Sequence, residues 1–311
     1  MSALICGSYA YDTIMVFHDK FKNHILPDKV HILNVAFLVP DMRREFGGCA
    51  GNIAYNLKLL GGSPLPMATV GHDFEKYRQW VDQCRISRKH IKVIEDTYTG
   101  QAFITTDMDD NQITAFHPGA MNLAHENKVA DAEGVRIGMV SPDGRKGMIE
   151  HAKQFTEAGI PFIFDPGQAM PMFDGKELMK FVEQATWVAL NDYEAQLLQE
   201  RTGKSLEELG KQVDAFIVTL GGNGSRIYSD GQQLDIPVAK AKKLNDPTGC
   251  GDAYRAGLLY GLMNDMDWGL TGRIAAMMGA IKIEQHGTQN HAFSRSEFEA
   301  MFKESFDMEL S

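Results

Sequence analysis

The fold of this chain is indicated most clearly by the stretch Asp246-Pro247-Thr248-Gly249-Cys250-Gly251-Asp252, which leads directly into an apolar segment, residues 253–262. A polar, glycine-rich turn followed by such a segment predicts the start of a buried helix. The first N–H groups of a helix lack partners and carry partial positive charge, so the turn is suited to an anion. Gly249 and Gly251 let a phosphate approach the backbone, and with Cys250 between them three amides are expected to face one oxyanion.

Asp252, at the junction of turn and helix, has two roles open to it. An aspartate at a helix start commonly caps the helix. A carboxylate beside an anion site can instead act as a general base. The turn alone does not distinguish the two roles, so the rest of the chain must decide.

The composition excludes several classes of protein. The chain has 311 residues and a formal net charge of −10, which argues against non-specific nucleic-acid binding but not against a phosphorylated small ligand. Its four cysteines form no C-x-x-C pair and its histidines form no metal-binding pattern, so we expect reduced thiols and no structural transition metal. The sequence shows neither a secretory signal nor a membrane-spanning apolar run. We therefore predict a cytoplasmic protein without nucleic-acid or membrane partners.

From about residue 135 onward, short apolar strands alternate with helices. Strands are expected at 135–140, 160–165, 187–191 and 215–220, and helices at 144–158, 176–184, 193–201 and 270–285. This alternation predicts right-handed βαβ units and a doubly wound, mostly parallel sheet flanked by helices on both faces. A hairpin at 225–238 is expected at one edge. No repeat or linker divides the chain, so residues 1–311 are predicted to form a single α/β domain.

The N-terminal part contains a second, smaller group of predicted strands. Short strands at 16–17, 30–33 and 35–39, with a hairpin at 100–116, indicate a small β-sheet lid formed by about 13–46 and 98–118. Phe37, Phe103 and Phe116 are candidates for an aromatic wall facing a substrate. Exposed apolar residues on such a sheet also favour a homodimer through the lid.

Polar residues follow several of the predicted strands. Asp12 lies in a turn beyond the first strand, which is predicted at 3–7, and Asn191 and Glu194 follow the strand at 187–191. Because parallel strands end at one edge of a sheet, these side chains are expected to lie close together. Asn191 and Glu194 lie one helical turn apart, which suits a hydrated Mg²⁺ on a nucleotide, or an ordinary helix cap with an exposed glutamate.

Two further glycine-rich turns are notable. In residues 46–62 a turn enters a helix; Gly48 allows close approach of a ligand, and Asn52 either binds a hydroxyl pair or only caps the helix. The loop Thr219-Leu220-Gly221-Gly222-Asn223-Gly224 offers a hydroxyl and backbone amides, but a strand follows it. It is therefore not a dinucleotide-binding motif. A Walker A sequence is also absent from the chain, which disfavours P-loop kinases.

Four of these motifs together resemble a known family. Gly47-Gly48-Cys49-Ala50-Gly51-Asn52, Asn191-x-x-Glu194, Thr219-x-Gly221-Gly222 and Asp246-x-Thr248-Gly249-Cys250-Gly251-Asp252 occur in the order typical of the ribokinase/PfkB family of carbohydrate and nucleoside kinases. The resemblance covers essentially the whole chain. It implies a ribokinase-like α/β fold with a β-sheet lid, and ATP-dependent phosphorylation of a primary alcohol with Mg²⁺.

The resemblance also implies roles for individual residues. Asp252 matches the family's catalytic base, and Gly249, Cys250 and Gly251 match its anion hole. The remaining matches are Asn191 and Glu194 for Mg²⁺ and phosphate, with Glu194 acting through water; Thr219, Gly221, Gly222 and Gly224 for the nucleotide; Asp12, Gly48 and Asn52 for sugar hydroxyls; and Asp246 and Thr248, with residues 287–289, for a monovalent cation such as K⁺. Two positions depart from the pattern. Cys250 replaces the usual alanine, and Ala10 replaces an asparagine of ribokinases, which weakens the simple-sugar interpretation.

The sequence of the last motif, together with residues 116–122 and 287–291, looks most like the corresponding segments of bacterial adenosine/nucleoside kinases of this family. The leading hypothesis is therefore a kinase of the 5′-hydroxyl of a purine nucleoside, with Phe103 and Phe116 contacting the base. The alternatives are a free-sugar kinase and a non-catalytic ligand-binding protein on the same fold. A sugar-phosphate kinase would need a basic cluster, for which only Arg43-Arg44 is a candidate.

Overall fold

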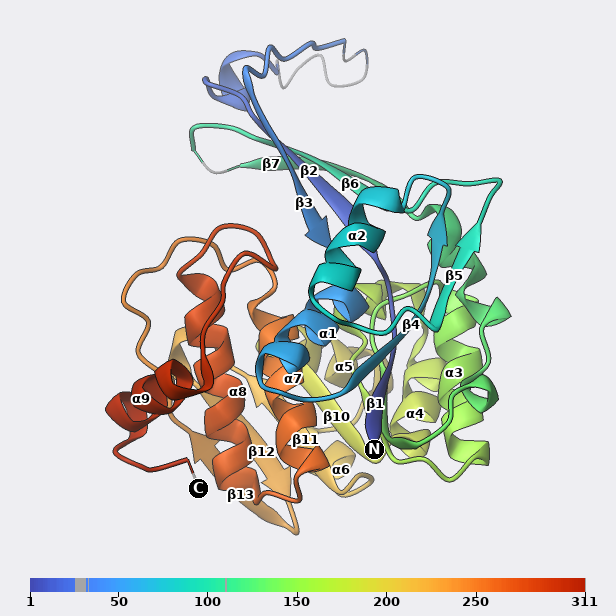
Figure 1. Ribbon diagram of the computed structural model, residues 1–311, viewed down its shortest axis with the longest axis vertical. Helices are drawn as coiled ribbons and strands as arrows, with labels where there is room; N and C mark the ends of the chain where they lie inside the picture. Colours follow the sequence, from blue (N-terminus) through green and yellow to red (C-terminus); the bar gives the residue numbers. More distant parts are fainter. Residues whose placement is uncertain (26–31, 33, 110, 311) are drawn as a thin grey trace.

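The large part of the molecule is built on a nine-stranded sheet, shown in Figure 1. The computed structural model describes residues 1–25, 32, 34–109 and 111–310. The strand order is β13-β12-β11-β10-β9-β8-β1-β4-β5. The strands are β1 Ser2–Cys6, β4 Pro64–Gly71, β5 His90–Ile94, β8 Val135–Val140, β9 Phe162–Phe164, β10 Trp187–Asn191, β11 Ala215–Thr219, β12 Ser225–Ser229 and β13 Gln232–Ile236. Pairing is parallel from β5 to β11 and antiparallel only through the hairpin β12–β13 at the edge.

Helices cover both faces of this sheet, so the predicted doubly wound architecture is confirmed. They are α1 Cys49–Leu59, α2 Glu75–Gln83, α3 Arg145–Glu157, α4 Gly175–Gln184, α5 Asp192–Thr202, α6 Leu206–Gly210, α7 Cys250–Met263, α8 Trp268–Ile283 and α9 Arg295–Phe306. Alternate residues of β1 point to opposite sides: Ile5 packs in the core with α1 and α7, whereas Leu4 packs in the core with α3, α4 and α5. In the part of the chain that the structure describes, no helix is long and apolar enough to cross a membrane.

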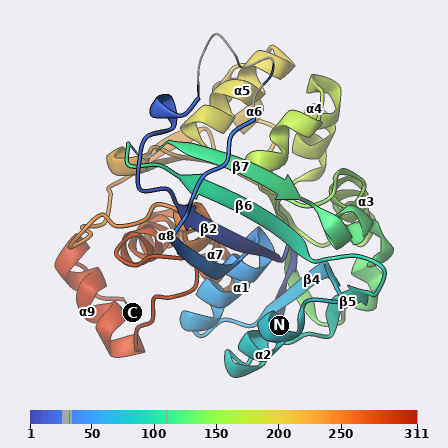
Figure 2. The same ribbon diagram turned by 90° about the horizontal axis from the view of Figure 1, so that it is seen from above.

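A separate four-stranded sheet projects from one end of the large sheet, and Figure 2 looks down on it. Its order is β3-β2-β6-β7, with β2 Ala10–Val16, β3 Asp41–Gly47, β6 Gly100–Thr106 and β7 Gln112–His117. The predicted strand at 35–39 is wrong, because this segment is irregular and Phe37 packs instead on Phe17 and Phe21. Apart from residue 32, the predicted strand at 30–33 lies outside the described residues. Asp12, expected in a turn, lies within β2.

Helices α7 and α8 pack unusually closely because small residues face each other. A Cβ atom on Gly257 would lie 2.4 Å from the Cα atom of Ala275, and one on Gly261 would lie 2.3 Å from Oγ1 of Thr271. The C-terminal end of α8 meets the turn that precedes α7, where the N–H of Asp246 donates to the carbonyl of Ile283 at 3.1 Å. The fold thus places the last turn of α8 against the glycine-rich turn that starts α7.

Candidate active site

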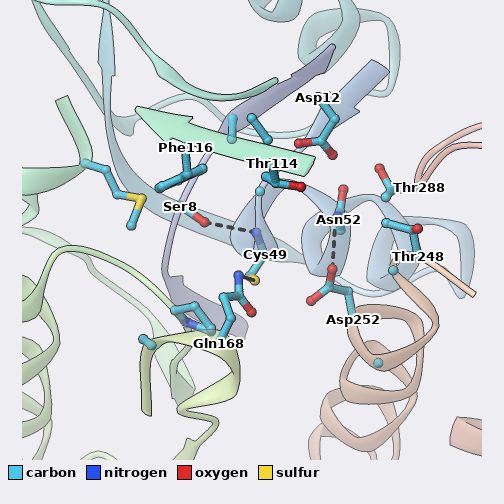
Figure 3. A pocket seen from close by; sticks show the side chains of 18 of the residues that line it. Ser8, Asp12, Cys49, Asn52, Thr114, Phe116, Gln168, Thr248, Asp252 and Thr288 are labelled. Carbon is cyan, nitrogen blue, oxygen red and sulfur yellow. Dashed lines mark hydrogen bonds between the residues drawn. The ribbon is translucent and has the colours of Figure 1, made fainter. Parts of the chain in front are cut away.

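Two neighbouring cavities meet at Asp252. The first, of about 580 Å³, lies between the small sheet and the first turns of α1 and α7, and Figure 3 shows its lining side chains. The second, of about 320 Å³, lies beyond the carboxyl ends of β10 and β11. Both are lined by Cys49, Pro142, Gln168, Gly251 and Asp252. A carboxylate at this junction can contact molecules bound on either side, which suits transfer of a group between two ligands.

Asp252 does not cap its helix. The N-cap of α7 is Gly249, with φ 79°, and the cap makes no side-chain hydrogen bond. The Asp252 carboxylate instead accepts a hydrogen bond at 2.8 Å from Nδ2 of Asn52. Burial raises the pKa of Asp252 to about 7; the Asn52 hydrogen bond opposes this shift, and the charge of Asp165 adds to it. A carboxylate with this pKa can accept a proton near neutral pH.

Asn52 is itself held by a chain of hydrogen bonds. Its Oδ1 accepts from Nε2 of Gln289 at 2.9 Å, and Oε1 of Gln289 accepts from Nε1 of Trp80 at 2.8 Å. Because an indole nitrogen only donates, Trp80 fixes the orientation of the Gln289 amide, which in turn directs the NH₂ group of Asn52 toward Asp252. Asn52 also lines the first cavity, with one N–H and one lone pair left for a ligand.

The turn before α7 offers a different set of amides from the one predicted. The N–H of Cys250 donates to the carbonyl of Pro247 at 3.1 Å, so it is already used within the turn. The N–H groups of Gly249, Gly251 and Asp252 have no acceptor among the described residues. The predicted anion hole is therefore corrected: the amide of Cys250 is used within the turn, and the two flanking glycines, with Asp252, supply the donors that are unpaired in the described chain.

The first cavity has a polar floor and an apolar wall. Asp12, Gly48 and Asn52 all line it, as predicted, and Phe116 forms part of the wall. Burial, and then the charges of Glu45 and Asp246, raise the pKa of Asp12 to about 6. The other lining residues are Ser8, Ala10, Cys49, Ala102, Thr114, Met121, Pro142, Gln168, Ala169, Met172, Thr248, Gly249, Gly251, Asp252 and Thr288.

The expected contact of Phe103 with a substrate needs correction, whereas Gly48 has a second reason to be glycine. Phe103 is not among the residues of the described chain that line this cavity. Its neighbour Ala102 faces the cavity, and adjacent strand residues point to opposite faces. Gly48 has φ +87°, and a Cβ atom there would lie 2.6 Å from the backbone nitrogen of Ala10. Its lack of a side chain is therefore needed for protein packing as well as for access of a ligand.

The second cavity contains Asn191, Glu194, Thr219 and Gly221 from the predicted nucleotide motifs. Asn191 and Glu194 form a reciprocal capping box, in which each side chain accepts from the other residue's backbone N–H at 2.8 Å. The cap of the alternative interpretation is thus present, but its exposed glutamate is not: the Glu194 side chain is only 12% exposed and lines the cavity. Of the other expected glycines, Gly222 is not part of the lining; neither is Gly224, where φ is +84° and a Cβ atom would meet the carbonyl of Ile236 at 2.1 Å.

A buried ion pair lies at the base of this cavity. Arg255, one turn after Asp252 in α7, donates to Oδ1 of Asp165 at 3.1 Å and lies 3.8 Å from Oε2 of Glu194. Its Nε has no partner in the described chain. Burial raises the pKa of Asp165, and Arg255 offsets part of that shift. The charge of Arg255 therefore favours the ionised forms of Asp165 and Glu194, against the burial that raises the pKa of both.

The loop expected to hold a monovalent cation already contains a positive charge. Nζ of Lys282 donates to the backbone carbonyl of Asp246 at 2.8 Å. The two carboxylate oxygens of Asp246 accept from the N–H groups of Thr248 and Gly287, each at 2.9 Å. Burial alone would raise the pKa of Asp246, but these backbone hydrogen bonds outweigh it and hold the pKa below its usual value.

Comparison with known sequences identifies the family. Residues 13–295 match the pfkB family carbohydrate kinase. The chain belongs to the pfkB family. The predicted ribokinase-like fold and the prediction of a phosphotransferase acting on an alcohol are both confirmed by this match and by the relatives that follow.

Several relatives of this pfkB-family chain are nucleoside kinases. It is 48% identical to the Burkholderia thailandensis nucleoside kinase, solved in complex with inosine, with a TM-score of 0.91 over 99% of both chains. The solved Methanocaldococcus jannaschii nucleoside kinase is 28% identical, with a TM-score of 0.89 over 98% of this chain and 99% of that one. A Lactococcus lactis ribokinase is 30% identical over 268 residues, 83% of this chain and 86% of that protein.

Several site residues of this pfkB-family chain were not found from its sequence. Asp165, Arg255 and Gln168 lie at or near the ends of predicted elements, where a single polar residue has an ordinary explanation. Arg255 had one local signal: it is a charged residue one turn after Asp252 in an otherwise apolar helix. Trp80 carried no such signal, and Gln289 was noted only as part of residues 287–289 for a cation. The bonds of Trp80 to Gln289 and of Gln289 to Asn52 depend on the folded chain.

Proposed function

We propose that this protein is an ATP-dependent nucleoside kinase that phosphorylates the 5′-hydroxyl of a purine nucleoside. The observation that carries the proposal is the position of Asp252 at the junction of two cavities, beside unpaired backbone amides. The first cavity, of about 580 Å³, has the size of a site for a nucleoside-sized ligand. The Burkholderia thailandensis relative was solved with inosine and with ADP-inosine. This supports a nucleoside and an adenine nucleotide as the two ligands here.

The first cavity offers both parts of a nucleoside a suitable surface. Phe116, Met121, Met172 and Ala102 supply an apolar wall against which a purine can pack. Asp12 and Asn52 provide hydrogen-bonding groups on the opposite side for ribose hydroxyls. A free sugar would leave the apolar wall in contact with water, so this lining favours a nucleoside over a simple sugar.

The chemistry follows from the position of Asp252. Its carboxylate accepts the proton of the attacking hydroxyl, and the N–H groups of Gly249 and Gly251 face the negative charge on the transferring phosphoryl group. The small sheet above the first cavity is placed to exclude water. Asp252, oriented by the hydrogen bond from Asn52, thus takes the proton of the attacking oxygen, while the turn stabilises the charge on the phosphoryl group.

The second cavity fits the phosphates of a nucleotide and its Mg²⁺. Arg255 has a buried Nε without a partner, and Glu194 presents a carboxylate to the same space. Bound Mg²⁺ neutralises charge on the phosphates, and Glu194 would hold it through water, since Mg²⁺ keeps several waters in protein sites. Thr219 and Gly221 line the part of the cavity nearest β11, where the nucleotide itself is expected.

The direct test is a kinase assay with ATP and Mg²⁺ across ribose, fructose, adenosine, inosine, guanosine and cytidine. We expect turnover of at least one purine nucleoside, with the phosphate located on the 5′ oxygen by NMR of the product. Asp252→Asn serves as the matched inactive control. Turnover of ribose or fructose without any nucleoside would replace the nucleoside assignment by a sugar kinase. Binding without turnover of any alcohol would favour the non-catalytic alternative.

Two further expectations belong with this proposal. The small sheet exposes Ile113 and Phe103 to solvent, which supports the predicted homodimer through the lid. Light scattering of the purified protein checks this, and a monomer at micromolar concentration would contradict it. We also propose a cytoplasmic location, which fractionation of cells that express the protein would test.

A further inference from the structure

The feature that carries this inference is a buried ammonium group beneath the turn that starts α7. Lys282 is the penultimate residue of α8, and its side chain is fully buried. Its Nζ donates to the backbone carbonyls of Asp246 at 2.8 Å and Gln285 at 3.1 Å. A buried ammonium is unfavourable unless hydrogen bonds replace its water. Two carbonyl acceptors provide that replacement, so the charge is built into this position.

The ammonium is connected to the catalytic turn through Asp246. The carbonyl that it holds belongs to the first residue of the stretch 246–252, and the carboxylate of the same residue binds the N–H of Thr248 within the turn. Burial lowers the pKa of Lys282 below its usual value, and the nearby carboxylates of Asp246 and Asp252 oppose this shift by favouring the charged form. Lys282 therefore supplies a positive charge at the first residue of the turn 246–252.

This arrangement does not fit the monovalent cation that the family resemblance led us to expect at the Asp246 and Thr248 loop. Such a cation is held by oxygen atoms, chiefly carbonyls. The carbonyl of Asp246 already accepts from an ammonium, and each oxygen of its carboxylate already accepts from a backbone N–H group, so each of these atoms has only one lone pair left. A second positive ion at the same oxygen atoms would also be repelled by Lys282.

We propose that the Lys282 ammonium takes the place of a monovalent-cation activator, so that phosphoryl transfer by this protein is independent of K⁺. Lys282 acts as a positioning residue, because it holds the turn 246–252 in the shape that presents the two glycine amides and adds a fixed positive charge at the first residue of that turn. The activity readout of this proposal rests on the proposed kinase function, whereas the cation-binding readout does not.

The first experiment needs no variant. Phosphoryl transfer and thermal unfolding of the unmodified protein are measured in a buffer with choline as the monovalent cation, and then with K⁺, NH₄⁺ or Na⁺ at equal ionic strength. We expect the rate to change by less than about twofold and the melting temperature to be the same in all four salts. Activation of several-fold by K⁺, or a melting temperature raised by K⁺ over choline, would overturn the proposal.

A matched pair of variants tests the role of the ammonium itself. Lys282→Ala opens a space lined by carbonyls, whereas Lys282→Met fills the same space with an apolar chain of similar length. We expect both to lose about tenfold or more in kcat in choline buffer, and only Lys282→Ala to recover activity and melting temperature with K⁺ or NH₄⁺. Lys303→Ala, an exposed lysine, is the surface control. Full activity of Lys282→Ala in choline would overturn the positioning role.

The thermal measurements also distinguish failure of the proposed kinase function from failure of the proposed role of Lys282. If no alcohol is phosphorylated, the proposed function fails, but the cation response of Lys282→Ala against the unmodified protein still decides whether the lysine occupies a cation site. If the kinase is active and needs K⁺, the kinase function stands, and the proposal that the Lys282 ammonium replaces the cation is wrong.

Discussion

Nδ2 of Asn52 lies 2.8 Å from Oδ2 of Asp252, so the first turn of α1 holds the carboxylate at the start of α7 across 200 residues of sequence. The bond stabilises the charged form of Asp252, since an N–H donor favours a carboxylate over a carboxylic acid. It also joins the two glycine-rich turns that were recognised separately in the sequence. The Asp252 carboxylate is therefore positioned by the glycine turn that contributes to the first cavity.

Removing the hydrogen bond between Asn52 and Asp252 should lower the activity that depends on the Asp252 carboxylate. Asn52→Leu deletes a hydrogen bond to a charged group, worth about 1.5–3 kcal/mol, so we expect kcat/KM to fall by roughly 10- to 100-fold. The pKa seen in the pH–rate profile should rise, because the charged form has lost its donor. Gln289→Leu should give a smaller effect of the same kind. Asn290→Ala, at an exposed neighbouring amide, is the matched control, and an equal loss in that variant would contradict the positioning chain.

The pH dependence of activity follows from Asp252. Its pKa is raised to about 7 by burial, and only the deprotonated carboxylate accepts the substrate proton. We expect kcat/KM to be constant above neutral pH and to fall about tenfold per pH unit well below it. Steady-state rates measured across this pH range give the acidic side of the pH–rate profile directly. A profile that stays flat down to the ordinary pKa of an aspartate would show that Asp252 is not the titrating base.

The same raised pKa predicts an effect on stability. The folded protein disfavours the charged form of Asp252, so the stability that the residue contributes decreases as pH rises from its unfolded value of 3.8 to about 7. Asp252→Asn, which carries no charge, should raise the melting temperature by a few degrees above neutral pH. Calorimetry should show this difference shrinking as the pH falls toward the unfolded pKa. A variant less stable at high pH would contradict the stated cause of the shift.

A pair of glycines tests the packing around the first cavity. Gly48 and Gly61 have nearly the same φ, +87° and +86°, but a Cβ atom on Gly48 would meet backbone atoms at 2.6 Å, whereas one on Gly61 meets nothing within 4 Å. Gly61→Ala should therefore cost about 1 kcal/mol of stability from backbone strain alone. Gly48→Ala should cost about 2–4 kcal/mol, because the clash adds to that strain. Chemical denaturation of both variants measures the difference, and equal losses would contradict it.

The sequence predicted the large sheet well, because its strands are buried on both faces and read as short apolar runs between helices. The small sheet was harder to predict. The run of apolar residues at 35–39 has the pattern of a strand, but Phe37 uses its ring to cover Phe17 and Phe21 from an irregular segment. Local apolar content does not reveal whether a backbone partner is available.

The residues of the site also differ in how well the sequence predicts them. The glycine turns and Asp252 were found because each needs a particular residue at a particular spacing. Arg255, and the bond from Gln289 to Asn52, were missed because the partners of these residues, Asp165 and Asn52, are 90 and 237 residues away, and no local pattern joins them. Cys250 was expected to offer its amide, but a short local hydrogen bond within the turn uses it.

Asp252→Asn is the most direct test of the central claim, that Asp252 takes the proton of a nucleoside hydroxyl at the junction of the two cavities. The measurement is the rate of phosphoryl transfer from ATP to inosine or adenosine, with binding of nucleoside and ADP measured by calorimetry on the same samples. We expect kcat to fall by about 10²- to 10⁴-fold while both ligands still bind within a few-fold of the unmodified protein. Turnover close to that of the unmodified protein would contradict the claim.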